Sequence, residues 1–265
     1  MSGANIQVII PMAGQGERFK FAGYQIPKPL LPIHGVEMFK WVIANLYDPR
    51  VESYTLIVSE ALGIELQVEK ISKTLGIKIH LKKLAKLTDG PATTVSLGLR
   101  GLKRDQPLVV ANSDQYVDCN IADFYNTLQE NSTNDGTILT MNDSDPKWSY
   151  VKLDSDQLVS EVQEKRVISE IATVGIYGFK SVSLFADSYI QMKDKNIRTN
   201  GELYVAPMYN ELIANGYRIG QINLGQINKV MHGFGIPRDY ENFCKNPQSK
   251  ELQVRIIERL SGKSI

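Results

Sequence analysis

The feature that most limits the possible folds is an apolar strand near the start of the chain that ends in a loop containing glycine. Residues 6–11 are almost all apolar and rich in β-branched side chains, which predicts a buried central strand. In the loop at 13–19, Gly14 and Gly16 let the backbone approach a bulky ligand closely. Successive amide N–H groups of such a loop can form a concave anion site. We therefore expect a phosphate group to bind at the end of the first strand.

Two cations follow this loop. Arg18 comes just after the glycines, and its guanidinium can grip two phosphate oxygens at once. Lys28 lies between Pro27 and Pro29, which stiffen its backbone. A strand, a glycine loop and two fixed cations together favour a triphosphate site. The loop matches neither the Rossmann fingerprint nor a Walker loop, because it has no third glycine and no Gly-Lys-Ser/Thr.

The first half of the chain alternates expected strands with expected helices, which indicates a parallel sheet covered on both faces. The strands are expected at 6–11, 54–58, 77–81 and 108–111, and the helices at 38–47, 62–75, 91–99 and 123–130. In the second half, expected strands at 136–141, 149–153, 158–164 and 173–179 have only turns between them, which predicts mixed or antiparallel strands. Expected helices at 182–192, 202–215, 239–244 and 251–260 and strands at 217–224 and 229–234 follow. The predicted fold class is α/β, with a mostly parallel mixed central sheet flanked by helices.

No linker, repeat or low-complexity tract interrupts the chain, so we predict one domain over residues 1–265. Its phosphate-binding half is expected at about 1–135 and its second half at about 136–245. A C-terminal helix at 248–261 is expected to pack either on its own core or on a partner subunit of a homo-oligomer.

Composition excludes several classes of protein. Hydrophobic residues make up 43% of the chain, which argues against general disorder. A net charge of +1 argues against a nucleic-acid binder. The N-terminus is short and polar and no apolar run approaches the ~18 residues of a membrane span, so we expect a cytoplasmic protein without a membrane partner. Cys119 and Cys244 lack metal-ligand spacing and are expected to be free thiols in a reducing cytosol.

A second candidate site follows the expected strand at 108–111. In parallel α/β sheets, ligands bind beyond the carboxyl ends of the strands, where Asp114 is expected to lie. Mg²⁺ prefers one or two carboxylates together with phosphate oxygens and water. The position therefore predicts a Mg²⁺ ligand, the alternative being a turn aspartate that binds its own backbone.

Taken together, these stretches resemble the sugar-1-phosphate nucleotidylyltransferases, a nucleoside-triphosphate transferase family, and especially its bacterial capsule and lipopolysaccharide members. The matching motifs are Ala-Gly-Gln-Gly-Glu-Arg-Phe at 13–19, Pro-Lys-Pro-Leu-Leu-Pro at 27–32, Asp-Gly-Pro-Ala at 89–92, Asn-Ser-Asp at 112–114, Val-Gln-Glu-Lys at 162–165, Thr-Val-Gly-Ile-Tyr at 173–177 and Gly-Glu-Leu at 201–203. The resemblance implies a Rossmann-like nucleotide-diphospho-sugar transferase fold. It also implies transfer of NMP from an NTP to a sugar 1-phosphate, giving an NDP-sugar and pyrophosphate for surface polysaccharide synthesis.

The resemblance implies a role for each matching residue. Arg18 would meet the β- and γ-phosphates, Lys28 the α-phosphate and Lys165 the phosphate of the acceptor, and these three form the expected catalytic set. The residues expected to bind the NTP are Met12, Ala13, Gly14, Gln15, Gly16, Glu17, Gly90, Pro91, Ala92, Asn112 and Ser113. Those expected to bind the sugar phosphate are Tyr150, Glu164, Gly175 and Glu202, with Gly175 leaving room for the sugar ring.

Two of these residues also have a simpler interpretation. Lys165 could belong to a solvated strand end, because Glu161, Glu164 and Arg166 are close to it in the sequence. Glu202 could be an acid in the first turn of the expected helix at 202–215, where the helix dipole favours it.

The expected chemistry needs cations more than a general base. A phosphate monoester dianion is a competent nucleophile, and the main obstacle is the meeting of two anions. Positioning and charge neutralisation supply most of the catalysis in such reactions. His34, His80 and His232 are scattered along the chain and are expected to be structural or surface residues.

The chain departs from the resemblance at one position. Relatives often carry a second metal-binding aspartate in the segment that corresponds to 230–235, where this chain has Gly233. Asp239 is close by but is expected to start the following helix. Either Asp114 holds Mg²⁺ with phosphates and water, or another acid such as Asp118 helps, or metal use differs.

Three other functions stay open beside a sugar-phosphate nucleotidylyltransferase. The first is a cytidylyltransferase that acts on a phosphorylated non-sugar. The second is a glycosyltransferase of the related fold, although Asn112 interrupts its usual Asp-x-Asp motif and Arg18 and Lys28 would have no role. The third is a non-catalytic regulator that binds a nucleotide sugar, which Gly233 favours and the three cations disfavour.

Overall fold

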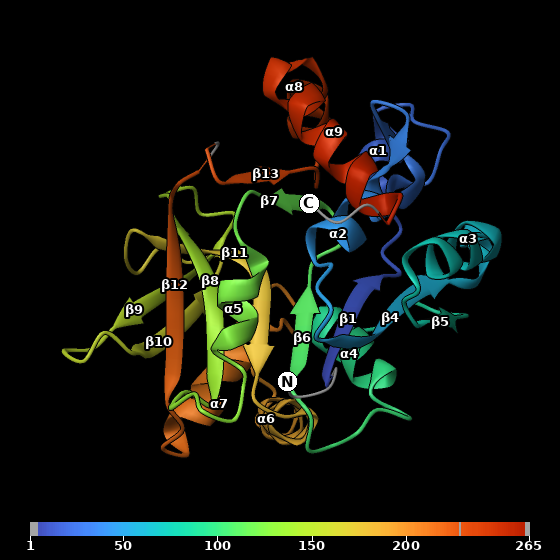
Figure 1. Cartoon of the computed structure of the whole chain (residues 1–265). Helices are drawn as coiled ribbons and strands as arrows, with labels where there is room; N and C mark the ends of the chain where they lie inside the picture. The colour runs from blue at the N-terminus through green and yellow to red at the C-terminus, as the bar shows by residue number, and fades with distance from the viewer. Residues whose placement is uncertain (1–4, 228, 263–265) are drawn as a thin grey trace.

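The computed structural model describes residues 5–227 and 229–262 (Figure 1). The strands are β1 (Ile6–Met12), β2 (Pro32–Ile33), β3 (Val36–Glu37), β4 (Val51–Ser59), β5 (Ile79–Leu84), β6 (Leu108–Ala111), β7 (Gln115–Val117), β8 (Gly136–Asn142), β9 (Ser149–Leu153), β10 (Val159–Glu164), β11 (Ile171–Phe179), β12 (Ile219–Gln226) and β13 (Met231–Gly233). The α-helices are α1 (Glu17–Phe21), α2 (Met38–Asn45), α3 (Glu65–Leu75), α4 (Pro91–Gly98), α5 (Ile121–Asn126), α6 (Val182–Asp194), α7 (Tyr209–Ala214), α8 (Pro237–Lys245) and α9 (Pro247–Leu260). Short 3₁₀ helices are η1 (Lys28–Leu30), η2 (Glu60–Leu62) and η3 (Ala206–Met208).

The main sheet of the described residues has nine strands. Its order is β10-β9-β11-β6-β1-β4-β5, and β8 pairs with β11 and with β12. The pairs β6–β1, β1–β4, β4–β5 and β8–β12 are parallel, whereas β11 is antiparallel to β6, β8 and β9. The mixed, mostly parallel core with helices on its faces confirms the predicted fold class.

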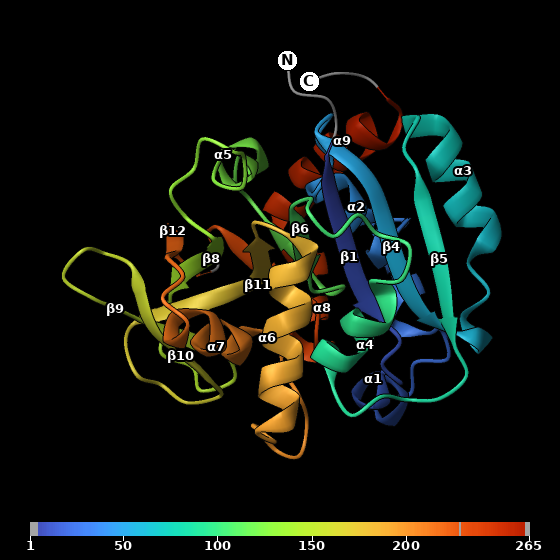
Figure 2. The same cartoon turned by 90° about the horizontal axis from the view of Figure 1, so that it is seen from below.

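The central position of β1 follows from the side chains on its two faces. Val8 and Ile10 point to one face, into a core shared with α2, α3 and α5. Ile9 points to the other face, into a core shared with α4, α6 and α7. Successive side chains of a strand alternate between faces, so a continuous apolar run is suited to a strand covered on both sides. Figure 2 shows α4 and α6 side by side over the second of these faces.

A third core lies between α2 and the C-terminal helices, which are red at the top of Figure 1. Trp41 of α2 makes edge-to-face contacts with Phe234 and Phe243. Leu252 and Ile256 of α9 are buried in the same cluster. The apolar face of α9 therefore packs on its own chain through these two residues.

The largest difference from the expected elements is in the segment 202–215, which was expected to be one helix. Residues 202–204 are not helical, Val205 is the N-cap of η3, and only Tyr209–Ala214 is α-helical. The amide of Leu203 donates to the carbonyl of Asp89, and the carbonyl of Leu203 accepts from Ala92. These backbone groups are used by a distant loop and are not free to form a helix, so Glu202 is not a first-turn helix residue.

Smaller differences concern the ends of elements. The helix expected at 62–75 begins only at Glu65, because Gly63 has a left-handed backbone with φ 64°. The helix expected at 123–130 is α5, which begins at Ile121 behind the capping side chain of Asn120. β7 and the short helix α1 were not expected.

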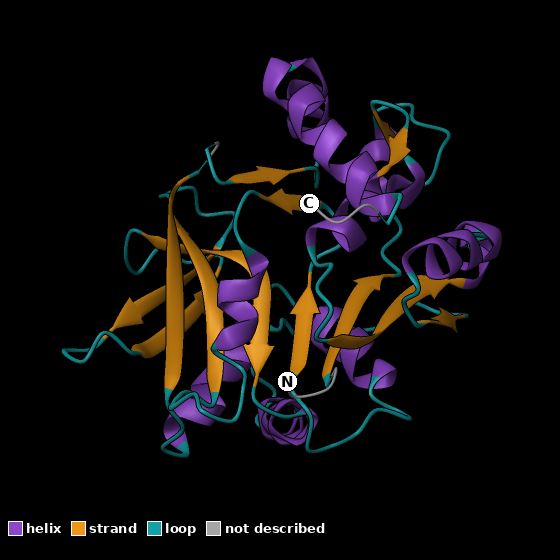
Figure 3. Ribbon diagram, in the orientation of Figure 1, coloured by secondary structure: helices purple, strands orange, loops and turns teal. Residues whose placement is uncertain are grey.

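The fold brings the ends of two neighbouring strands together at one edge of the sheet. β1 and β6 are parallel and adjacent, and Figure 3 shows their arrowheads pointing to the same edge. The glycine loop follows β1 and the segment 112–114 follows β6. Among the helices that the structure describes, none is long and apolar enough to pass through a membrane.

Candidate active site

The glycine loop after β1 turns sharply at Gly16 before entering α1. Gly16 has φ 62° and ψ 31°, a left-handed conformation that favours glycine. Its carbonyl accepts hydrogen bonds from the amides of Phe19 and Lys20. A Cβ at Gly16 would lie 3.3 Å from the Cβ of Lys28, so the loop passes close to the second predicted cation.

Lys28 connects this loop with the end of β6. It opens η1 between Pro27 and Pro29, and its Nζ lies 2.5 Å from Oδ2 of Asp114. The two side chains are 19% and 26% exposed, so a ligand in the adjoining cavity can reach both. Among the described residues, the Asp114 carboxylate is paired with Lys28 and not with its own backbone, which speaks against the turn interpretation of Asp114.

The backbone of Asp114 is held from the other side by the segment after β13. β13 pairs with β7, which places Gly233 opposite Gln115. The amide of Phe234 donates to the carbonyl of Asp114 at 2.7 Å. A Cβ at Gly235 would lie 3.1 Å from Oδ2 of Asp114, so Gly235 leaves this face of the carboxylate open.

Two cavities meet at this place. The first, of about 330 Å³, is the nucleotide cavity. It is lined by Pro11, Met12, Ala13, Gly14, Gly16, Lys28, Pro29, Leu87, Thr88, Gly90, Pro91, Thr94, Asn112, Ser113, Asp114 and Glu202. The second, of about 380 Å³, is the acceptor cavity, and its polar lining includes Arg18, Gln115, Lys147, Trp148, Ser149, Glu164, Lys165, Thr173, Tyr177, Tyr204 and Asp239. Both are lined by Pro11, Pro91, Asn112 and Asp114, so these residues form a common wall.

Most of the residues predicted to bind the NTP line the nucleotide cavity, but four predicted residues do not. Arg18 lines the acceptor cavity, and Gln15 lines a third cavity together with residues such as Ser59 and Leu84. Ala92 is fully buried inside α4. Glu17 is not in the lining of any described cavity.

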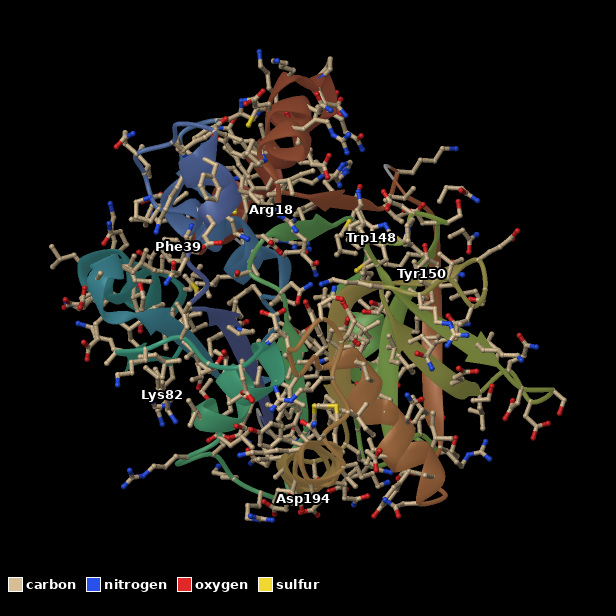
Figure 4. The ribbon with its side chains drawn as sticks, turned by 180° about the vertical axis from the view of Figure 1, so that it is seen from behind. Arg18, Phe39, Lys82, Trp148, Tyr150 and Asp194 are labelled. Atoms are coloured by element: carbon tan, nitrogen blue, oxygen red, sulfur yellow. The ribbon has the colours of Figure 1, made fainter. Side chains whose placement is uncertain are left out.

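Of the residues predicted on the acceptor side, Glu164 and Gly175 line the acceptor cavity, as does Lys165 of the predicted catalytic set, but Tyr150 does not. Tyr150 is completely buried and its hydroxyl donates to the carbonyl of Asp145 at 2.8 Å. The reason is the alternation of β9, which directs Ser149 into the cavity and the next residue into the core. Glu202 was also predicted on this side but lines the nucleotide cavity. Figure 4 labels Tyr150 beside Trp148, with Arg18 on the other side of Trp148 in the same upper part of the view.

Gly90 and Gly175 each allow a close contact that shapes one of the cavities. A Cβ at Gly90 would lie less than 3.0 Å from the backbone of Leu203. A Cβ at Gly175 (φ 74°) would overlap the side-chain amide of Asn112 and lie 2.7 Å from Oε1 of Gln115. Gly175 therefore makes room first for these two protein side chains, whereas the resemblance implied room for a sugar ring.

Two charged groups of the acceptor cavity, Glu164 and Lys165, form hydrogen bonds with neighbouring side chains. Ser149 donates a short hydrogen bond to Glu164. Burial raises the pKa of the Glu164 carboxyl above its ordinary value, and the Ser149 hydrogen bond and the charge of Lys165 offset only part of this. Lys165 donates to the hydroxyl of Tyr204 at 2.5 Å, and that hydroxyl donates to Glu202 at 2.5 Å.

The structure separates the acids that were considered as a second metal ligand. Oδ1 of Asp118 lies 3.4 Å from Nη1 of Arg255. Asp118 is not part of the lining of either cavity. Asp239 lies in the first turn of α8, as expected, and lines the acceptor cavity 3.5 Å from Lys147. No group of three or more His, Cys, Asp or Glu side chains with metal-binding geometry occurs in the described part of the chain. Asp114 is thus the carboxylate that lies in the common wall.

The sequence reasoning missed several lining residues. Trp148, Tyr177 and Tyr204 line the acceptor cavity, and Thr88 and Thr94 line the nucleotide cavity. Tyr177 and Tyr204 stand within or directly beside the motifs at 173–177 and 201–203, so motif proximity was the available signal for them. Trp148 had no such signal beyond its place just before a strand.

Comparisons with known proteins agree with this geometry. A family model described as nucleotidyl transferase matches residues 7–222. A nucleoside-diphosphate-sugar pyrophosphorylase from Vibrio cholerae RC9 has a similar structure, with a TM-score of 0.78 and 27% identity over 90% of this chain and 100% of that one. No curated protein matches the chain.

Two further solved structures share the fold at lower identity. An inositol-1-phosphate CTP transferase from T. maritima has a TM-score of 0.73 and 18% identity, over 97% of this chain and 98% of that one. A Bacillus anthracis protein, provisionally named a glucose-1-phosphate thymidylyltransferase and solved with a sucrose, has a TM-score of 0.73 and 17% identity. The alignment covers 98% of this chain and 96% of that one.

Proposed function

Because this chain belongs to the nucleotidyl transferase family, we propose that it transfers NMP from an NTP to a sugar 1-phosphate, giving an NDP-sugar and pyrophosphate. The observation that carries the proposal is the common wall of the two cavities. Asp114 stands in this wall, Lys28 stands on the nucleotide side, and Arg18 and Lys165 stand on the acceptor side. A site with cations on both sides of a shared wall suits a reaction that brings two phosphorylated molecules together.

The proposed reaction balances without a general base. An oxygen of the acceptor phosphate forms a bond to the α-phosphorus of the NTP, and the bond from that phosphorus to the bridging oxygen of the β-phosphate breaks. Pyrophosphate takes the electron pair and leaves. Catalysis then depends on alignment of the two substrates and on neutralisation of their charges.

Each charged side chain has a role in this scheme. Lys28 binds the α-phosphate, and the loop at 13–16 wraps the triphosphate. Arg18 was predicted on the β- and γ-phosphates, but because it lines the acceptor cavity we propose that it bridges the NTP and the acceptor. Lys165 binds the acceptor phosphate, and Glu164 accepts hydrogen bonds from acceptor hydroxyls.

The residues present fit Mg²⁺ bound together with substrate. Asp114 lies in the common wall, and Gly235 leaves one face of its carboxylate open. One protein carboxylate with phosphate oxygens and water is a coordination that Mg²⁺ accepts. Asp114 would hold the ion, which would supply neutralisation of phosphate charge.

One alternative acceptor class has support of its own. The solved inositol-1-phosphate CTP transferase has the same fold over 97% of this chain, so a phosphorylated cyclitol or another non-sugar is a second candidate. Two other functions are less well supported. A glycosyltransferase would leave Lys28 and Arg18 unused, and a regulator would bind an NDP-sugar without turnover.

We place the proposed reaction in the cytoplasm, in the supply of activated sugars for surface polysaccharides.

Release of pyrophosphate tests the proposal directly. The full chain is incubated with Mg²⁺ and each of the four common NTPs, alone and with hexose 1-phosphates, heptose 1-phosphate, inositol 1-phosphate or phosphocholine. We expect pyrophosphate from one NTP only in the presence of one class of acceptor, at a rate lower by about 100-fold or more in the Lys28→Gln variant. Glycosyl transfer from an NDP-sugar without pyrophosphate, or NDP-sugar binding without turnover, would contradict the proposal.

A further inference from the structure

Tyr204 connects charged groups of the two cavities and belongs to none of the matching motifs. Its hydroxyl accepts a hydrogen bond from Nζ of Lys165 at 2.5 Å and donates one to Oε2 of Glu202 at 2.5 Å. The same Nζ lies 4.5 Å from the centroid of the Tyr204 ring. A phenol has one proton, so donation to Glu202 directs the oxygen lone pairs to Lys165.

The backbone of Lys165 is held in an uncommon conformation. Lys165 follows directly after β10 and has φ 55°, which non-glycine residues seldom adopt. Its amide donates to the carbonyl of Trp148 at 3.0 Å. Strained backbone of this kind persists where surrounding contacts hold it. The hydrogen bond to Trp148 holds the backbone of Lys165, but its flexible four-carbon side chain still lets Nζ take several positions.

We propose that Tyr204 is a positioning residue that holds Nζ of Lys165 where the acceptor phosphate arrives. The inference rests on the proposed function, since it takes Lys165 as the ligand of that phosphate. Tyr204 and Lys165 line the acceptor cavity, and Glu202 lines the nucleotide cavity. The hydrogen bonds from Lys165 to Tyr204 and from Tyr204 to Glu202 therefore connect the two cavities.

The environment of the phenol is consistent with this role. Burial, together with the hydrogen bond and charge of Glu202, raises the pKa of Tyr204 well above its ordinary value. The hydroxyl therefore keeps its proton at neutral pH and remains an acceptor for the ammonium group. Arg18 and Glu164 also act on Tyr204 electrostatically, which places the phenol among the charged groups of the acceptor cavity.

Kinetics of the Tyr204→Phe variant separate positioning from a purely structural effect. The variant keeps the ring beneath Lys165 and loses only the hydroxyl. We expect the KM for the acceptor to rise about tenfold, as for loss of one hydrogen bond to a charged group, with the KM for the NTP unchanged. In a Lys165→Met background the same substitution should change kcat/KM less than about twofold, because nothing remains to be positioned.

A matched control has the same chemistry elsewhere. Tyr189 of α6 has Lys193 over its ring at 5.8 Å and donates to Oγ1 of Thr93 at 3.2 Å. It lies outside the linings of both cavities. Tyr189→Phe should leave both KM values unchanged. An equal rise of the two KM values in Tyr204→Phe, or additive effects with Lys165→Met, would overturn the proposal.

A second measurement needs no substrate. The full chain is labelled with N-acetoxysuccinimide, and acetylation of each lysine is followed by mass spectrometry. Relative to exposed Lys250, Lys165 should react at least about threefold faster in Tyr204→Phe and at the wild-type rate in Tyr189→Phe, because its amine is no longer held. An unchanged acetylation rate of Lys165 in Tyr204→Phe would show that the Tyr204 hydroxyl does not hold its amine.

The two proposals fail in different ways. If the wild-type chain releases no pyrophosphate with any substrate pair, the proposed function is wrong, and labelling still decides whether Tyr204 holds Lys165. If the wild-type chain is active and Tyr204→Phe changes neither the acceptor KM nor the labelling, the positioning role is wrong and the function stands.

Discussion

Replacing Gly90 with alanine tests whether the loop 85–90 before α4 and the segment 199–204 form one structural unit. Gly90 has φ 139° and ψ 167°, a combination open almost only to glycine. An added Cβ would lie less than 3.0 Å from both the amide nitrogen and the carbonyl oxygen of Leu203. Those two groups hydrogen-bond to Asp89 and Ala92 at 2.9 Å each. The two segments must therefore separate to accept the methyl group.

The expected loss of stability can be worked out from these contacts. The two backbone hydrogen bonds contribute about 1 kcal/mol each. The backbone conformation adds about 1–3 kcal/mol for a residue with a side chain. Gly90→Ala should therefore lower the free energy of unfolding by roughly 3–5 kcal/mol. Gly201→Ala is the matched control, because Gly201 has φ 82° in the same segment and no atom within 4 Å of its Cβ position. It should cost only about 1–2 kcal/mol.

Urea unfolding provides the assay, followed by the fluorescence of Trp41 and Trp148. The two variants should unfold with the same slope against urea but at different midpoints, because the surface exposed on unfolding is unchanged. Since Gly90 also lines the nucleotide cavity, the KM for the NTP should rise in Gly90→Ala and stay at the wild-type value in Gly201→Ala. If Gly90→Ala and Gly201→Ala lower the free energy of unfolding equally, within about 0.5 kcal/mol, the reasoning is refuted. The close contact between an added Cβ at position 90 and the backbone of Leu203 would then cost nothing.

Three further variants test individual parts of the site. Lys28→Gln should lower kcat about 100-fold or more in the pyrophosphate assay, because it removes a cation from the reacting phosphates, and unchanged kcat would exclude that role. Gly175→Ala should lower the free energy of unfolding, measured in urea, by roughly 2–5 kcal/mol. The causes are the φ of 74° and the overlap of an added Cβ with the side chain of Asn112. Gly216→Ala, with φ 82° and free space, should cost only the backbone part, and equal costs would contradict this. Burial raises the pKa of Glu164 in the folded state, so the unfolded chain ionises first and wild-type stability falls as the pH rises from the unfolded value to the folded one. Glu164→Gln should remove that fall, and parallel pH profiles of the two proteins would show the sign to be wrong.

The elements of the sheet could be predicted because burial on both faces leaves a local signal. β1 and β6 are continuous apolar runs, and their observed bounds are within one residue of those expected. The end of such a run also marks where a ligand site can lie. This is why the glycine loop and Asp114 could be placed at one edge of the sheet before any contact was known.

The segment 202–205 could not be predicted, because its conformation depends on a distant partner. The local pattern favours a helix, but the backbone of Leu203 bonds to Asp89 and Ala92, which are more than 100 positions earlier in the chain. The same cause hides Tyr204, which lines the acceptor cavity from this non-helical segment. Tyr150 shows the opposite error, since nearness in sequence to a site residue does not decide which face of a strand a side chain takes.

The charge balance of the lining explains why substrate and cation are expected to bind together. The two cavities are lined by four cations and four carboxylates within the described residues: Arg18, Lys28, Lys147 and Lys165, and Asp114, Glu164, Glu202 and Asp239. With every group ionised, this lining has no net charge, whereas a triphosphate and a phosphate monoester bring several negative charges. The raised pKa of Glu164 reduces the opposing charge by at most one. In the proposed reaction the fixed cations would orient the two anions, and a divalent cation held at Asp114 with the phosphates would supply the remaining neutralisation.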